Sequence, residues 1–308
     1  MDKAELFAQL RLTLTLVTRS HKLELGDWFK MIRSFSLLLL PLALCLLMGL
    51  SQAGSSATLQ QFWERAREIT YKSPEELKAQ HDKEVRKGQF YAKIMCGDPS
   101  VKEVALTFDD GPHPKFTPQI LAILKKYNVK ATFFVVGKMA KQYPDLVRAE
   151  AAAGHDVGNH TYDHVNLTRI PVPEVAMEWL RCSQTIKSIL GTSPVFARPP
   201  GGDYDKDVIS AATAAGLTTV LWTDDPGDYA KPGDKRIETR VLDRTGNGGI
   251  ILIHDGIQQT IDVLPQIIEH LRQRGYRFVT MSQMAQGKTL AFLPTRTQRL
   301  IGGSAALK

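Results

Sequence analysis

The sequence predicts an α/β fold, a distorted (β/α) barrel of about seven parallel strands with an N-terminal helical extension. Between residues 101 and 285, short apolar segments alternate with longer amphipathic segments, which is the pattern of strands alternating with helices. The strand segments are apolar throughout, as expected for a parallel sheet that is covered by helices. A doubly wound open sheet is the alternative, but it would need a Gly-rich phosphate turn after an early strand, and the sequence contains none.

The expected elements follow one another in a regular order. Strands are expected at residues 104–108, 132–136, 156–159, 195–197, 218–222, 250–253 and 277–280. Helices are expected at residues 118–127, 138–153, 173–190, 205–215, 234–245 and 261–274. Helices should stop at Gly154, Gly191, Gly216 and Gly275, because glycine readily ends a helix. Upstream, residues 58–98 resemble one or two polar, amphipathic helices that end near Gly97.

The composition is that of a globular protein and argues against nucleic-acid binding. The 308 residues are 43% apolar and 23% charged, with a formal charge of +7. Residues 101–285 contain 21 Lys and Arg against 21 Asp and Glu, so the positive excess lies in the flanks. Nucleic-acid binding would need a basic stripe on the folded body, and none is expected here.

The N-terminus has the layout of a secretory signal. Residues 35–50 form an apolar run, which Lys30 and Arg33 precede and small residues follow. Cleavage is expected at residues 51–53, and Met31 is an alternative start. The run is short for a membrane span of about 20 residues, but an uncleaved signal would anchor the chain to a membrane through residues 35–50. A buried core helix is the third interpretation. We therefore expect an exported, extracytoplasmic protein: periplasmic, cell-wall or secreted.

The chain accordingly divides into four parts. We expect a cytoplasmic extension plus signal at 1–57, a helical extension at 58–100, a catalytic domain at 101–285 and a basic tail at 286–308. Cys96 and Cys182 remain outside the signal. They form a disulfide in an exported protein or stay as two packed thiols.

Two motifs supply the residue types of a metal site. Asp109 and Asp110 end the first strand and precede Gly-Pro, where the backbone can turn both carboxylates toward one pocket. His160 and His164 follow a later strand, four residues apart. One carboxylate and two imidazoles can hold a catalytic divalent metal and leave one position open.

Three further motifs follow later strands. They are Arg198-Pro199-Pro200-Gly201, the acidic segment at 224–228, and His254. In a barrel of parallel strands the carboxyl ends meet on one face, where the active site lies. The motifs are therefore expected to converge.

The order of these motifs resembles that of the polysaccharide deacetylase family, carbohydrate esterase family 4. The resemblance covers about residues 101–285 and depends on TFDDG, HxxxH, RPP, an Asp-rich segment after Trp222, and LxH. It implies a distorted barrel and one divalent metal ion, usually zinc, with cobalt or a similar ion possible. It also implies hydrolysis of N-acetyl groups on chitin-like or peptidoglycan glycans, which would be the chain's partners.

The resemblance also assigns roles by position. Asp110, His160 and His164 resemble the metal ligands. Asp109 resembles the catalytic base, and Arg198 the arginine that pairs with it. His254 resembles the catalytic acid and Asp228 the carboxylate that holds it, although Asp224 or Asp225 could serve instead. The Gly201 amide resembles the donor to the oxyanion, and Leu252 either lines the acetyl pocket or is a plain core residue.

Two positions depart from the family pattern. Gly201-Gly202 stand where Tyr usually follows the two prolines, with Tyr204 beyond them, and Tyr229 stands in place of Trp. Tyr204 and Tyr229 are therefore candidate substrate contacts. These departures keep two other functions open: a non-catalytic protein that binds cell-wall glycans, and a hydrolase of O-acetyl esters or of small amides.

Overall fold

Residues 68–286 of the computed structural model are described here. The expected signal at 35–50, its cleavage site, and the basic tail from residue 287 onward lie outside the described residues. Within residues 68–286, no helix combines the length and the apolar character needed to cross a membrane.

The sheet is parallel at every strand pair. Its strands are β1 (Lys93–Ile94), β2 (Glu103–Gly111), β3 (Thr132–Val135), β4 (Asp156–Asn159), β5 (Phe196–Ala197), β6 (Thr218–Val220), β7 (Gly249–His254) and β8 (Arg277–Phe278). The order across the sheet is β1-β6-β5-β4-β3-β2-β7, and β8 pairs with the start of β2.

The sheet curls until its two ends approach each other. Asp224, just beyond β6, forms a parallel bridge with Ile251 of β7, and the Thr223 amide donates to the Ile250 carbonyl at 3.0 Å. The architecture is therefore a distorted, incompletely closed barrel, and the predicted fold class is confirmed.

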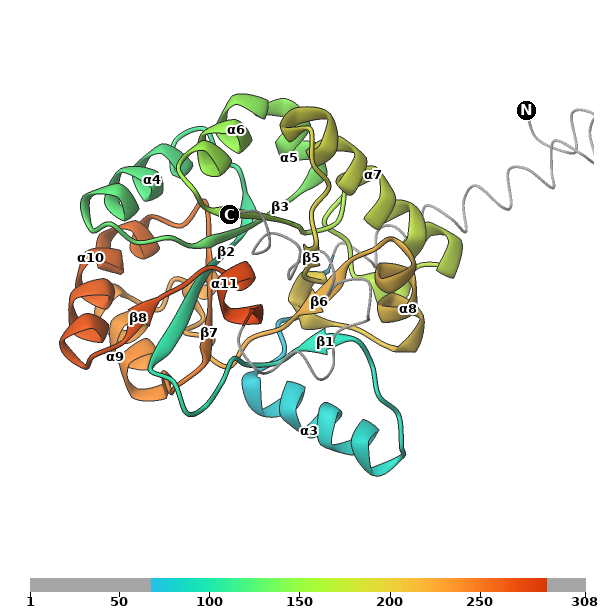
Figure 1. Ribbon diagram of the computed structural model, residues 1–308, viewed down its shortest axis with the longest axis horizontal. Coiled ribbons are helices and arrows are strands. Elements are labelled where there is room, and N and C mark those ends of the chain that lie inside the picture. The colour runs from blue at the N-terminus through green and yellow to red at the C-terminus, as the bar shows by residue number, and fades with distance from the viewer. Residues whose placement is uncertain (1–67, 287–308) are drawn as a thin grey trace, which may run out of the picture. The chain divides into compact units, whose positions relative to one another are not determined.

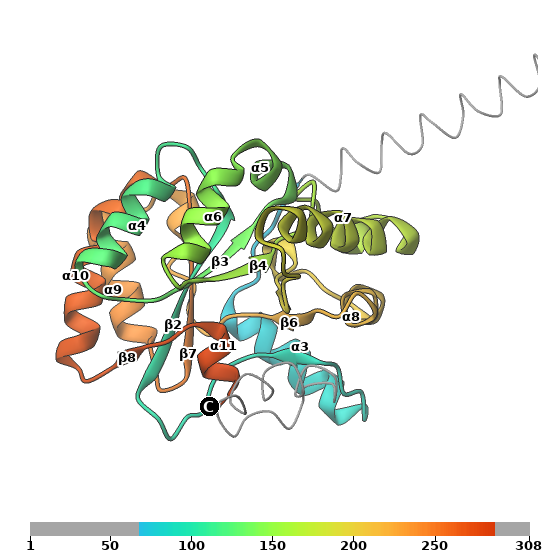
Figure 2. The same ribbon diagram turned by 45° about the horizontal axis from the view of Figure 1, so that its top comes forward.

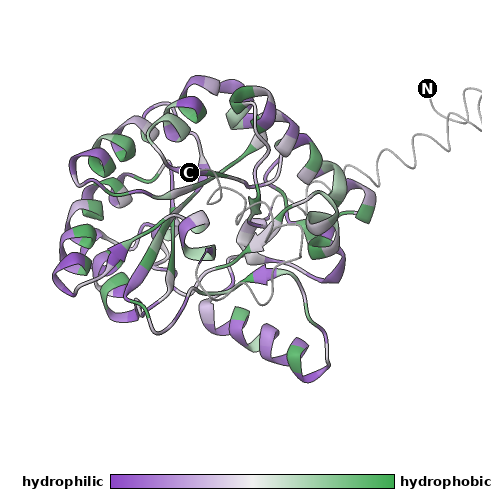
Figure 3. Ribbon diagram, in the orientation of Figure 1, coloured by the Kyte–Doolittle hydropathy of each residue, from purple (hydrophilic) through white to green (hydrophobic). Residues whose placement is uncertain are grey.

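Helices lie around the outside of the curled sheet (Figures 1 and 2). They are α4 (Thr117–Lys126), α5 (Gly137–Gln142), α6 (Pro144–Ala152), α7 (Val172–Leu190), α8 (Lys206–Ala214), α9 (Asp234–Arg244) and α10 (Gln258–Gln273). Two more helices, α3 (Pro74–Arg86) and α11 (Met281–Ala285), come from the ends of the described chain. The helices alternate between hydrophobic and hydrophilic residues (Figure 3), as expected for elements with one buried face.

The strands have two buried faces because side chains alternate along them. On β2, Ala105 belongs to the inner hydrophobic cluster, which also contains Ile250 and Leu252 of β7. Val104 and Leu106 belong to the outer cluster beneath the helices. The continuous apolar runs that predicted a parallel sheet therefore reflect burial on both sides.

Three details differ from the sequence-based expectation. The helix expected at 138–153 is interrupted at Tyr143, between α5 and α6, because Pro144 has no amide hydrogen to continue the helix. In the segment 58–98, the described part contains one helix, α3, followed by β1, whose two residues are too few to show alternation. Of the two alternatives for the cysteines, the structure has the unpaired thiols: Cys182 is free and buried as that alternative expects, whereas Cys96 is free but exposed and not packed.

The expected helix stops are confirmed. Gly154, Gly191, Gly216 and Gly275 all have positive φ, between 76° and 84°. This left-handed conformation is strained for residues with a Cβ atom and ends a helix at little cost for glycine.

Candidate active site

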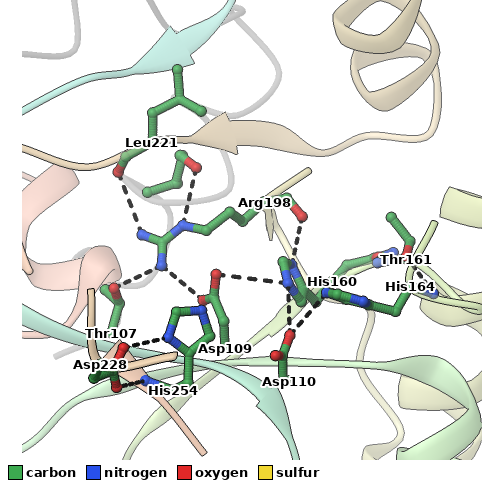
Figure 4. A network of polar contacts seen from close by, with 12 residues as sticks. Thr107, Asp109, Asp110, His160, Thr161, His164, Arg198, Leu221, Asp228 and His254 are labelled. Carbon is green, nitrogen blue, oxygen red and sulfur yellow. Dashed lines mark hydrogen bonds and ion pairs between the residues drawn. The ribbon is translucent and has the colours of Figure 1, made fainter. Parts of the chain in front are cut away.

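The polar motifs gather at the carboxyl ends of the strands. Asp109 and Asp110 lie near the end of β2, His160 follows β4, Arg198 follows β5, and His254 ends β7. Figure 4 shows these side chains directed toward one another. A parallel arrangement produces this convergence, because every strand delivers its last residues to the same rim.

A local irregularity in β2 lets two adjacent carboxylates face the same place. Asp109 pairs in register with His254 of β7. The register with β3 shifts between Phe108 and Gly111, and Asp110 has a φ of 72°. Such an irregularity redirects a side chain that would otherwise point to the opposite face of the sheet. The turn expected here is thus built into the strand itself.

The loop that carries the two histidines is held by hydrogen bonds to its backbone. Thr161 and His164 have φ values of 65° and 53°. The Asn159 side chain accepts from the Thr161 amide at 2.8 Å, and Thr161 Oγ1 accepts from the His164 amide at 3.1 Å. Glu178 of α7 accepts from the next two amides, those of Tyr162 and Asp163, at 2.9 and 2.8 Å. These bonds fix a backbone that would otherwise be strained.

Asp110, His160 and His164 fit a divalent metal ion. One ligand atom from each lies within 4.8 Å of the others. Asp110 Oδ1 is 3.3 Å from His160 Nε2 and 2.9 Å from His164 Nε2. Asp110 Oδ1 and His164 Nε2 are buried without a geometrically sound hydrogen bond, and such orphaned atoms suit a bound cation. A carboxylate with two imidazoles suits zinc or a similar ion.

The surroundings of His160 and of Asp110 suit both residues to bind a cation. His160 is 1% exposed, and its Nδ1 lies 2.8 Å from the Arg198 carbonyl. A proton on Nδ1 would leave Nε2 as the ligand atom. Burial alone would raise the pKa of Asp110, but the charge of His164 and the close contacts of Asp110 with both imidazoles hold it well below its usual range. The carboxylate is therefore ionised.

Arg198 is fully buried and pairs with Asp109. Its Nη1 donates to Asp109 Oδ1 at 2.8 Å and to Thr107 Oγ1 at 2.7 Å. Its Nε and Nη2 donate to the carbonyls of Val220 and Leu221, at and just beyond the end of β6, at 3.3 and 3.4 Å. Asp109 is 1% exposed, so the pairing satisfies a buried carboxylate and fixes its orientation.

His254 and Asp228 form a second buried pair. His254 Nδ1 lies 2.7 Å from Asp228 Oδ1, and the His254 amide donates to Asp228 Oδ2 at 2.8 Å. Thr260 and the Tyr229 amide also donate to Asp228, at 2.5 and 2.9 Å. Burial lowers the pKa of His254, but the charge and hydrogen bond of Asp228 outweigh it, with Asp110 and Asp109 adding to them, and raise it to about 10. His254 Nε2 is buried without a partner in the described structure.

Asp228, rather than its acidic neighbours, is the carboxylate in contact with His254. Asp225 accepts from the Gly227 amide at 2.7 Å and so supports the turn. Asp224 accepts from Thr223 Oγ1 at 2.7 Å, and burial raises its pKa to about 6. Spacing along the sequence left these three open, and the hydrogen bonds separate them.

The remaining predicted residues are in different surroundings. The Tyr229 ring lies 5.5 Å from that of His254, edge-on. Gly201 is buried with a φ of 65°. Leu252 is fully buried in the inner cluster, two residues before His254 on β7. Tyr204 is 3% exposed, and its hydroxyl faces Glu84 of α3 at 3.5 Å. The structure therefore places Tyr204 against α3 and not beside the metal ligands.

Sequence reasoning missed four residues that shape the site. Thr107 and Thr260 contact Arg198 and Asp228, Glu178 organises the histidine loop, and Tyr71 packs beside His254. Thr107 is two residues before Asp109 on β2, so strand alternation could have identified it. Tyr71 lies outside the motif region, and nothing in the sequence signalled its position.

Comparison with known proteins gives a consistent result. The family model for polysaccharide deacetylases matches residues 97–220. A peptidoglycan-N-acetylglucosamine deacetylase of Bacillus cereus is 38% identical over 200 residues, which cover 64% of this chain and 73% of the relative. A chitooligosaccharide deacetylase of a Bradyrhizobium species is 38% identical over 211 residues, 63% of this chain and 96% of the relative.

A solved structure is similar in both fold and sequence. It is the crystal structure of a peptidoglycan N-acetylglucosamine deacetylase in complex with 4-naphthalen-1-yl-N-oxidanyl-benzamide. It aligns with a TM-score of 0.63 and 37% identity, over 66% of this chain and 95% of that one. The similarity thus spans nearly all of the solved chain.

Proposed function

This chain belongs to the polysaccharide deacetylase family, and on that premise we propose that it hydrolyses the acetamido group of an N-acetylated glycan with Asp109 as base and His254 as acid. It is an enzyme of carbohydrate deacetylation. The relatives named for peptidoglycan N-acetylglucosamine and for chitooligosaccharides favour a substrate that contains N-acetylglucosamine.

A divalent ion, most simply zinc, would be held by Asp110, His160 and His164. When bound, it supplies a Lewis acid for the acetyl carbonyl and lowers the pKa of water. The chain's own residues then have to remove a proton from the attacking water and supply one to the leaving amine.

Asp109 is suited to accept the proton from the water. Its Oδ1 is occupied by Arg198, while its Oδ2 lies 3.7 Å from His160 Nε2, at the edge of the metal triad. One oxygen is therefore fixed and the other faces the place where water would react. A base must lie within hydrogen-bond reach of the proton that it takes.

His254 is suited to protonate the nitrogen of the leaving amine. An amine leaves poorly as an anion, so its nitrogen must gain a proton as the C–N bond breaks. The Asp228 pairing at Nδ1 keeps His254 protonated and directs Nε2 away from Asp228. We assign the Gly201 amide to the developing oxyanion, since amide donors stabilise negative charge in an enclosed site.

The observation that carries this proposal is the arrangement of two separately held groups beside one metal triad. Asp109 is held by Arg198, and His254 by Asp228. Neither is tied to the other, so each is free for its own proton transfer.

Acetate release from the purified full chain tests the proposal. Acetylated chito-oligosaccharides, peptidoglycan fragments and acetyl-xylan form the substrate panel, assayed before and after chelation and after zinc is restored. We expect release from an N-acetylated glycan that chelation abolishes. Asp109→Asn should reduce kcat about 1,000-fold, whereas Asp145→Asn, at a carboxylate 90% exposed on α6, should not.

Three other outcomes of the acetate-release assay would each contradict part of the proposal. Acetate release that survives both chelation and Asp109→Asn would contradict the mechanism. Release from acetyl-xylan alone would identify an O-acetyl esterase, and glycan binding with no release would identify a non-catalytic protein.

We also propose that the chain acts outside the cytoplasm, with residues 35–50 as signal or anchor. The support is the sequence pattern of that segment and the cell-wall substrates for which relatives are named. Detection of the chain and of its N-terminal residue in an extracytoplasmic fraction would test this and would show whether cleavage occurs.

A further inference from the structure

The N-terminal segment before α3 lies directly on the loop that carries Gly201. The Lys72 amide donates to the Gly201 carbonyl at 2.9 Å. A Cβ atom on Gly201 would lie only 2.4 Å from the Thr70 carbonyl oxygen and 3.0 Å from Ile69 Cγ2. Glycine at 201 therefore leaves the space that residues 69 and 70 occupy, and a larger residue would displace them.

Side-chain contacts and the start of α3 hold this N-terminal segment in place. Lys72 Nζ forms an ion pair with Asp203 at 3.1 Å and donates to Gln80 at 2.8 Å. Ser73 caps α3 through a reciprocal capping box with Glu76. Leu77, one turn into α3, is fully buried in the inner cluster. The segment is thus held as part of the wall of the site.

This anchoring places the Tyr71 ring in the catalytic region. It stacks on Tyr229 with centroids 3.9 Å apart and planes 16° apart. It meets the His254 ring edge-on at 5.1 Å and 87°. Burial raises the pKa of the Tyr71 hydroxyl, and the charges of Asp110, Asp109 and Asp228 raise it further. Tyr71 therefore lies between two residues of the candidate site, with its ring face on Tyr229 and its ring edge to His254.

We propose that Tyr71 contacts the substrate and, with Tyr229, forms an aromatic wall against which the sugar ring bearing the acetamido group packs. Sugar rings present apolar C–H faces, and aromatic side chains bury them with a defined orientation. The inference rests on the proposed function, because it assigns a residue that determines substrate specificity to the same site. It differs from the motif assignments in that Tyr71 comes from residues 68–73, outside the matched family region.

Glycan binding by the full chain tests the contact directly. Calorimetry with an acetylated chito-oligosaccharide would use Asp109→Asn as the parent, so that turnover is too slow to disturb the titration. Adding Tyr71→Ala should weaken binding about tenfold, whereas Tyr71→Phe, which keeps the ring, should remain within about threefold. Phe90→Ala is the matched control, because Phe90 is an aromatic residue between α3 and β1 that is 67% exposed.

A kinetic comparison in the otherwise unmodified chain separates substrate contact from a structural role. Tyr71→Ala should raise KM for the oligosaccharide about tenfold, and kcat/KM should fall several-fold more for the oligosaccharide than for a small aryl acetate. An equal loss on both substrates would mean that Tyr71 merely supports the fold or the metal site. Faster glycan hydrolysis would mean that it blocks the site. Either result overturns the proposal, as does unchanged glycan binding.

The two proposals fail in distinguishable ways. If the unmodified chain binds the oligosaccharide but releases no acetate from any glycan, the proposed function is wrong and calorimetry still decides the role of Tyr71. If acetate is released and Tyr71→Ala leaves binding and KM unchanged, the function stands and the Tyr71 contact is wrong.

Discussion

At the scale of single residues, the histidines proposed as metal ligand and as acid, His160 and His254, differ in the hydrogen bond that each makes through Nδ1. His160 meets a neutral carbonyl through Nδ1, which leaves Nε2 for a cation. His254 meets the Asp228 carboxylate through Nδ1, which favours the protonated ring. The partner of Nδ1 thus distinguishes the proposed metal ligand from the proposed proton donor.

Replacing Asp228 with Asn should lower both the activity and the pKa of His254. Burial, which lowers that pKa, would then act with less opposition. We expect kcat/KM to fall on the order of 100-fold and its alkaline limb to move to lower pH. A pH–rate profile from pH 5 to 10 measures this, with Asp234→Asn, an exposed acid at the start of α9, as control.

The raised pKa of His254 also makes the stability of the fold depend on pH. The folded-state pKa of His254 is about 10, above its ordinary value of 6.5. The pair with Asp228 therefore stabilises the fold fully below about pH 6.5, and this contribution is lost as the pH rises through about 10. An unchanged alkaline limb in Asp228→Asn would contradict the assignment of His254 as the acid.

Single residues also show where sequence reasoning reached its limit. The candidate metal ligands could be predicted from the sequence, because a carboxylate and two histidines four residues apart are a typical ligand set for a divalent ion. Asp228 could not be separated from Asp224 and Asp225, since the loop that carries all three, residues 224–228, can turn any of them inward. Aromatic substrate contacts were expected from Tyr204 and Tyr229. Tyr229 lies beside His254, Tyr204 lies against α3, and Tyr71, which is remote in sequence, packs beside His254. No periodicity encodes a chain crossing of this kind.

At the scale of elements, helix α7 supports the histidine loop through one buried carboxylate. Glu178 is 1% exposed and accepts both amides of Tyr162 and Asp163. Burial raises its pKa to about 7, with the two amides opposing that change. A side chain of a long helix thus holds a short loop in place, although that loop has strained backbone angles.

Replacing Glu178 with Leu should loosen the metal site while leaving its ligands in place. Two backbone amides would lose their acceptor, at a cost of about 1–3 kcal/mol each. We expect metal affinity to fall by roughly 10–100-fold, measured by competition with a chromophoric chelator. Glu174→Leu, on the same helix but only half-buried, is the control. Equal affinity in the two variants would show that the loop holds itself.

The elements were more predictable than the loops between them. The spans of α7, α9 and β4 follow the apolar periodicity within one residue at each end. The break between α5 and α6 required weighing Pro144 against a pattern that continues through it. β1 depends on pairing with Thr219 and Val220, far along the chain, and two residues carry no periodicity of their own.

At the scale of the whole molecule, Arg198 connects opposite parts of the curled sheet. It contacts Thr107 and Asp109 on β2, and backbone carbonyls at and beyond the end of β6. Its guanidinium also lies 4.3 Å from the Phe134 ring centroid. Arg198, which pairs with the proposed base Asp109, therefore also links distant strands across the barrel interior, so we expect it to affect both activity and stability.

A double-mutant cycle should separate these two roles. Arg198→Met leaves the Asp109 carboxylate buried and unpaired, which costs about 3–5 kcal/mol and lowers the melting temperature by roughly 10 °C. Asp109→Asn combined with Arg198→Met removes both charges, so it should be more stable than Arg198→Met alone by about 1–3 kcal/mol. Thermal and urea unfolding in the presence of chelator measure this. Activity should stay lost in all three variants.

A second Arg–Asp pair in the same chain provides the matched control. Arg148 and Asp145 on α6 are 2.5 Å apart, with side chains 51% and 90% exposed. The corresponding cycle there should give coupling near zero, because water screens an exposed pair. If the coupling free energy were near zero in both cycles, the buried Arg198–Asp109 pair would contribute no more to stability than the exposed pair. A coupling confined to Arg198 and Asp109 is expected, since only that pair would leave a charge stranded inside the barrel.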